Sequence, residues 1–93
     1  MEFFITTKDN LIKYSDIKMF SKKGNKLFVL LGNKFVLVSD NYTNEIKDVY
    51  NEIDRIENII RNQNIFGVKV MCKFINNHID YTIYNKGGNT LFG

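Results

Sequence analysis

The 93-residue chain contains no proline, tryptophan or alanine, and it has a single cysteine and a single histidine. Because Cys72 is alone, it cannot form a disulfide within the chain, and the sequence gives no sign of an oxidising compartment. Cys72 and His78 together provide too few of the usual ligands for a zinc site. We therefore expect neither a metal nor another cofactor.

Long apolar runs are also absent, since the longest one has five residues and falls far short of a membrane span. The first residues do not combine a basic stretch with a following apolar stretch, as a signal peptide would. These features predict a cytoplasmic protein without membrane contact. The frequent Asn, Ile and Lys residues are typical of AT-rich coding sequences, which are common in low-GC bacteria and their phages.

The sequence contains no catalytic motif. Apart from hydroxyl groups, Cys72 and His78 are the only members of the usual nucleophile and base set. A turn at 76–77 would place residue 72 opposite residue 81, too far from His78 for a hydrogen bond between the two side chains. The carboxylates of the predicted helix are expected to face solvent, which offers no pair with separated pKa values. We predict that the protein is not an enzyme.

Two short apolar runs, at 27–31 and 35–38, are separated only by turn residues. Runs of this kind are typical of strands that are buried on both faces. Two further strands are predicted before them, at 3–7 and 11–20, and the second of these contains a break or bulge at Ser15-Asp16. Four consecutive strands joined by short loops predict an antiparallel meander.

The spacing of apolar residues changes to a helical period after residue 42 and predicts a helix over 43–62, with Thr43 or Asn41 as its cap. Ile59 lies beside the apolar stripe, where it would either widen this face or contact a partner. The stripe consists of Ile46, Val49, Tyr50, Ile53, Ile56 and Ile60.

Strand spacing returns at 65–75, with Lys69 and Lys73 on the side expected to be exposed, and a turn follows at 76–78. The last four residues form either a short strand or a loose tail. The sequence thus predicts a single domain over residues 1–93 with an α+β fold. Its parts are an antiparallel β-meander of about four strands, one long amphipathic α-helix and a C-terminal β-hairpin.

The spacing of Ile17, the two central strands, Glu45-Ile46 and Ile53 resembles a small β-meander followed by a helix. This pattern occurs in FlbD-type flagellar proteins and in the strands of LytTR-type DNA-binding domains. The resemblance covers about 50 residues and implies a fold, and it carries over no functional residues.

The net charge of +3 is unevenly distributed. Residues 8–34 contain seven lysines and two aspartates, a local charge of +5, whereas residues 40–57 contain six acidic and two basic residues, a local charge of −4. A basic group of strands and an acidic helix are most simply explained as solvated surfaces that attract one another.

One functional hypothesis starts from the basic residues. Lysines surround the loop of one predicted hairpin, and Phe20 lies nearby, where an aromatic ring could stack on a base. The scarcity of arginine in this region and the acidic helix argue against contact with a phosphate backbone. A nucleic-acid-binding module is therefore the alternative hypothesis. Its candidate contacts are Lys18, Lys22, Lys23, Lys26 and Phe20.

The leading hypothesis starts from apolar surface. The central strands are apolar on both faces, while only one helix is available to cover them. The second face must then meet the hairpin at 65–85, a second copy of the chain or a different protein. We predict a non-enzymatic protein that acts through protein–protein contact and forms a homodimer, with Ile59, Phe3 and Phe92 as candidate interface residues. One specific form is an inhibitor or regulator of a host protein, encoded by a phage or another mobile element.

Overall fold

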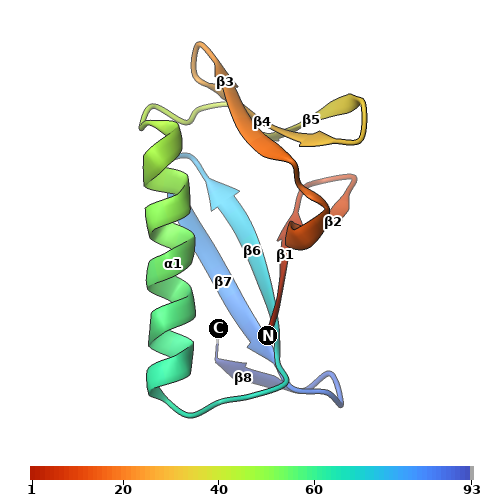
Figure 1. Ribbon diagram of the computed structural model, residues 1–93, viewed down its shortest axis with the longest axis vertical. Coiled ribbons are helices and arrows are strands. Elements are labelled where there is room, and N and C mark those ends of the chain that lie inside the picture. The colour runs from red at the N-terminus through yellow and green to blue at the C-terminus, as the bar shows by residue number, and fades with distance from the viewer. Residues whose placement is uncertain (93) are drawn as a thin grey trace.

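The computed structural model describes residues 1–92, with the backbone alone at residue 92. It confirms the predicted α+β class, because one α-helix lies among strands that form two separate sheets (Figure 1). In chain order the elements are β1 (Glu2–Thr6), β2 (Leu11–Lys13), the 3-10 helix η1 (Tyr14–Asp16), β3 (Met19–Lys23), β4 (Lys26–Leu31), β5 (Lys34–Ser39), α1 (Ile46–Asn62), β6 (Lys69–Ile75), β7 (His78–Tyr84) and β8 (Thr90–Phe92).

The smaller sheet is an antiparallel meander of β3, β4 and β5, three strands rather than the four expected. The predicted break near residue 15 exists as η1, and there the chain leaves one sheet and enters the other. Two tight turns join the three strands. Each contains a glycine with positive φ, Gly24 at +61° and Gly32 at +58°, a backbone region that glycine adopts without steric cost.

The larger sheet has the strand order β2-β1-β6-β7-β8. The pair β1–β2 is antiparallel, as expected, but β1 also pairs with β6 in parallel, although the two strands are far apart in the sequence. Phe3 lies opposite Val70 and Ile5 lies opposite Cys72 in this parallel pair. The first two strands therefore belong with the C-terminal hairpin rather than with the meander.

The C-terminal hairpin has the predicted register. Cys72 lies opposite Tyr81, and Ile75 lies opposite His78, on either side of a turn at Asn76-Asn77. The left-handed backbone of Asn76, with φ of 55°, suits a residue type that tolerates this region. The segment after residue 89, for which two alternatives were open, forms the short strand β8 against β7.

Helix α1 begins at Ile46, three residues later than predicted, and neither Thr43 nor Asn41 caps it. Glu45 is the N-cap residue, and the Asp48 carboxylate accepts a hydrogen bond of 2.9 Å from the Glu45 N–H in a capping box. Thr43 has a different role, because its N–H donates to the Asn77 Oδ1 and its hydroxyl accepts from the Asn77 side chain, both at 2.6 Å. These bonds tie the segment before the helix to the β6–β7 turn.

The apolar stripe of α1 packs against one face of the larger sheet, and the meander lies across the end where α1 begins and β6 finishes (Figure 1). Four of the six predicted stripe residues are buried, while Ile46 is half-buried and Tyr50 is 39% exposed. Buried residues of α1 and of both sheets form one continuous cluster. The buried members on the helix are Val49, Ile53, Ile56 and Ile60.

Candidate functional site

The structure separates the two residues that carry nucleophile and base chemistry. Cys72 is buried within β6, and burial raises the pKa of its thiol to about 12. His78 is exposed at the start of β7 and lies opposite Ile75, as the predicted register required. Within residues 1–92 no group of three or more histidine, cysteine, aspartate or glutamate side chains has a geometry suited to a metal ion. Cys72 is therefore a core residue.

The lysines expected to bind nucleic acid do lie around one hairpin, although they do not act as one group. Lys23 and Lys26 are exposed and lie opposite each other where β3 turns into β4. Lys18 is exposed at the opposite end of the meander, just before β3. The hairpin therefore carries separate positive charges at its two ends.

Lys22 points into the molecule instead. Its Nζ donates a hydrogen bond of 2.6 Å to the carbonyl oxygen of Asn44 and lies 5.7 Å from the ring centre of Tyr42. Tyr42 is a core residue, and burial, together with the carboxylates of Asp48 and Glu52, raises the pKa of its hydroxyl. Lys22 thus anchors the segment that precedes α1.

Phe20, expected to stack on a base, is 3% exposed and cannot do so in this fold. By strand alternation its side chain points to the inner face of the meander, where its ring packs against Tyr14, Tyr50 and Phe74. The proximity of Phe20 to lysines in the sequence was misleading. Lys22, two residues along β3, shares the inner face of Phe20, which the rest of the chain covers, whereas Lys23 lies on the outer side of the strand.

The three candidate protein-interface residues do not share a surface. Phe3 is buried in the core, with its ring edge-on to Tyr14, so its expected role in an interface is wrong for this fold. Ile59 is half-buried on α1. The side chain of Phe92 lies outside the part of the chain that the structure describes.

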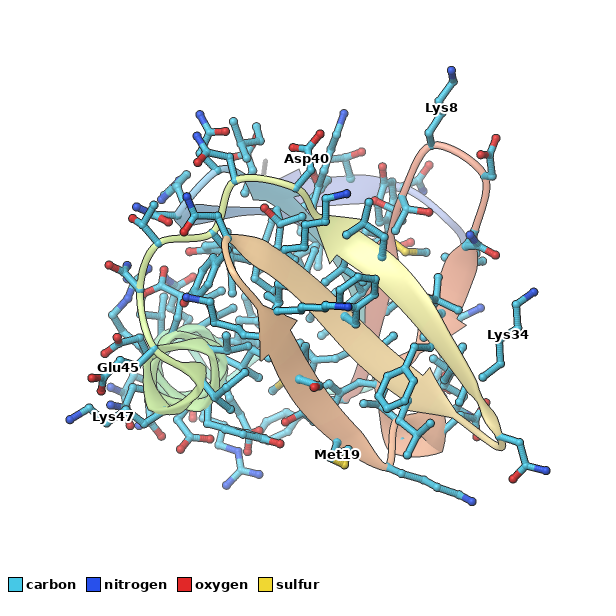
Figure 2. All side chains as sticks on the ribbon, turned by 90° about the horizontal axis from the view of Figure 1, so that it is seen from above. Lys8, Met19, Lys34, Asp40, Glu45 and Lys47 are labelled. Atoms are coloured by element: carbon cyan, nitrogen blue, oxygen red, sulfur yellow. The ribbon has the colours of Figure 1, made fainter. Side chains whose placement is uncertain are left out.

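The structure instead brings exposed apolar side chains together on the solvent-facing side of the meander. We call this side the outer face. Strand alternation and register place Met19, Leu30 and Phe35 in one row across the three strands. The next row contains Phe28 and Leu37. Figure 2 looks onto this face, with Met19 at the start of β3 and Lys34 at the start of β5.

The outer face is apolar and open to solvent. Phe35 is 52% exposed, Met19 44% and Leu37 41%, while Phe28 and Leu30 are half-buried by their neighbours. The rings of Phe28 and Phe35 pack edge to face, with centroids 6.5 Å apart. Contiguous exposed apolar side chains of this kind mark interaction surfaces more often than isolated ones do.

The expectation that the central strands are buried on both faces is therefore wrong. The inner face is covered, since Leu27, Val29 and Val38 are buried, but α1 covers the larger sheet rather than the meander. The C-terminal hairpin does not cover the outer face either, because β6 and β7 lie in the other sheet. Surplus apolar surface exists, as predicted. The outer face gathers several exposed apolar side chains, and others lie singly elsewhere, at Phe66, Leu11 and Ile75.

Two shallow grooves lie elsewhere on the surface. One, about 590 Å³, lies over the exposed face of the larger sheet, where Leu11, Met71 and Tyr84 line it together with Lys69, Lys73 and Asp80. A second, about 470 Å³, runs between β5 and the β1–β2 turn. Neither groove gathers a nucleophile with a base, and within residues 1–92 no helix is long and apolar enough to cross a membrane.

Comparison of the chain with protein-family models, with curated proteins and with solved structures found no match.

Proposed function

We propose that this chain is a non-enzymatic binding protein that acts through protein–protein contact, and that the outer face is its contact surface. The observation that carries the proposal is the pair of neighbouring apolar rows, one across β3, β4 and β5 and one across β4 and β5, in which Phe35, Met19 and Leu37 are each more than two-fifths exposed. Burying such side chains is favourable by about 25 cal/mol for each Å² removed from water. A protein of this kind regulates its partner by covering it, and inhibition of a host protein is one form of this activity.

Site-specific cross-linking in the source cells tests the proposal. A photoreactive benzoylphenylalanine in place of Leu37 is expected to yield a covalent adduct with another protein, because this position lies in the second apolar row. The same residue in place of Asn58, which is exposed on α1, is the matched control and is expected to yield none. Adding Phe35→Ser to the Leu37 variant is expected to remove the adduct while leaving the chain folded, since Phe35 is already half in solvent. Equal adducts at both positions, or none at position 37, would refute the proposal.

A nucleic-acid-binding module is the second candidate, favoured by the position of Phe28 and Phe35 on the same face as Lys23 and Lys26. These rings could take the stacking role that Phe20 cannot. If Lys18 also contacts the backbone, three phosphate contacts to single-stranded DNA predict that affinity falls about 20-fold between 50 and 200 mM salt. Fluorescence anisotropy with a labelled 15-nucleotide oligothymidine measures this, and absence of binding at 50 mM salt would exclude the candidate.

A further inference from the structure

The dimensions of the outer face limit what can pack on it. Neighbouring strands lie about 4.8 Å apart, so the three strands span about 10 Å from β3 to β5. This width matches the diameter of one α-helix, about 10–12 Å with its side chains. Strand β4 has six residues and therefore a length of about 20 Å, which corresponds to about 13 residues of helix. The face is one helix wide and between three and four turns long.

The charged residues of the meander itself have one sign. Residues 18–39, which contain the whole meander, include five lysines and no acidic residue. Lys23 and Lys26 follow the two apolar rows at one end of the strands, and Lys18 and Lys34 lie at the other end. None of these four lysines takes part in an ion pair with another residue of the described chain. Lys23 and Lys26 are in register with the outer-face rows, whereas Lys34 lies opposite Leu31 on the inner side of the sheet. An occupant with acidic side chains at the end beside Lys23 and Lys26 would complement this arrangement.

A second copy of the chain does not meet these requirements. Two outer faces packed about a two-fold axis would share their lysines across the interface with no acidic residue to offset them. The other apolar helix stripe that a second copy could offer is that of α1, and its side chains are already buried in its own core. A homodimer, if formed, would need a different surface.

The free edge of β5 is a poor template for an added strand. Leu27 lies opposite Ser39 and Phe28 lies opposite Leu37, so Val38 is an extra residue that interrupts the ladder. Bulges of this kind twist an edge strand away from regular pairing. An occupant therefore packs on the face rather than extending the sheet, and a helix is the element that covers a sheet face.

We infer that the outer face binds an amphipathic helix of a different protein, with an apolar stripe of about 13 residues and acidic side chains at the end that lies beside Lys23 and Lys26. This inference rests on the proposed function and adds the chemistry of the partner. The apolar rows contact the stripe, and Lys23 and Lys26, which lie on the outer face, pair with the acidic residues.

A designed peptide serves as the probe. It has 18 residues, with three glutamates at each end and leucines at helical spacing between them, and its matched partner carries lysine in place of all six glutamates. Binding to the ¹⁵N-labelled full chain is followed through amide chemical shifts. The glutamate peptide is expected to shift residues of the outer face, and the lysine peptide is expected to bind about tenfold more weakly, since the two pairs with Lys23 and Lys26, worth a few tenths of a kcal/mol each, become repulsions.

Charge reversal in the protein provides the control. The double variant Lys23→Glu/Lys26→Glu is expected to weaken the glutamate peptide about tenfold and to strengthen the lysine peptide. Lys69→Glu/Lys86→Glu changes the net charge equally at the far end of the molecule and is expected to change neither affinity. Equal effects of the two double variants, or equal binding of the two peptides, would overturn the inference.

Two further outcomes would also overturn the inference: no outer-face shifts at 1 mM glutamate peptide, or tighter binding at the same residues by oligothymidine or by vesicles of phosphatidylcholine and phosphatidylglycerol. These results do not decide the proposed function. A partner protein that is not an acidic amphipathic helix would still give a cross-linked adduct at position 37. Loss of that adduct would refute the proposed function itself.

Discussion

Replacing Phe20 by alanine is expected to lower the free energy of unfolding by about 3–5 kcal/mol, the cost typical of a buried phenylalanine. Its ring centre lies 5.4 Å from that of Tyr50, 6.3 Å from that of Tyr14 and 6.5 Å from that of Phe74. These neighbours belong to α1, η1 and β6, so the ring sits where the meander meets the helix and the larger sheet. Alanine would leave a cavity at the junction that holds the two sheets together.

Urea unfolding followed by circular dichroism measures this loss, and the midpoint of thermal unfolding is expected to fall by at least about 12 °C for a domain of this size. Phe35→Ala is the matched control, because it removes the same atoms from a ring that is 52% exposed. Its cost is expected to stay below about 1 kcal/mol. A similar loss for both variants would contradict the core role of Phe20. If Phe20 instead stacked on a base, its replacement by alanine would lower the affinity for nucleic acid and leave the stability unchanged.

The helix and the C-terminal hairpin could be predicted because their patterns are local. Four of the six predicted stripe residues of α1 are buried, and the predicted pairing of residue 72 with residue 81 is present. Both depend on periodicity within a short segment and on a turn that joins adjacent strands. The start of α1 was less predictable, since Thr43 had a competing partner in Asn77, 34 residues further along the chain.

The division of the strands between two sheets could not be predicted in the same way. The parallel pair β1–β6 joins residues more than 65 positions apart, and no local pattern encodes such a pairing. Antiparallel hairpins are favoured when a chain is analysed strand by strand, so the first two strands were assigned to the meander. The 3-10 helix at Tyr14–Asp16 was the one local sign of the change of sheet.

The apolar character of the proposed contact surface could be predicted from the sequence, but its position could not. The apolar character of 27–31 and 35–38 correctly indicated more apolar surface than one helix can cover, and the structure locates the surplus at Phe28, Phe35 and Leu37. Alternation along β5 could have separated the exposed Phe35 and Leu37 from the covered Val36 and Val38. The missing information was which face the rest of the chain would cover, and this depends on the long-range β1–β6 pairing.

The thiol of Cys72 is expected to react with dithionitrobenzoate at pH 8 about a thousandfold more slowly in the folded chain than in the unfolded chain. Cys72 is 2% exposed and burial raises the pKa of its thiol to about 12, so the folded state offers almost no thiolate at pH 8. Reagent therefore reaches the thiol mainly in molecules that have opened, which are about one in a thousand or fewer for a stable domain. A native rate equal to that of the denatured chain would contradict the burial of this side chain.

A matched variant separates burial from local sequence. In Cys72→Ser/Ile75→Cys the thiol moves three residues along β6 to a side chain that is 48% exposed, and it is expected to react like a free cysteine. Cys72 also reports on the junction at Phe20, because reagent reaches a buried thiol mainly through opened molecules. If Phe20→Ala lowers the free energy of unfolding by about 3 kcal/mol, the open fraction rises by about a hundredfold, and native Cys72 labelling should rise by the same factor. An unchanged rate in Phe20→Ala would mean that β6 opens without separating the two sheets, and would contradict the position of Phe20 as the contact that holds them together.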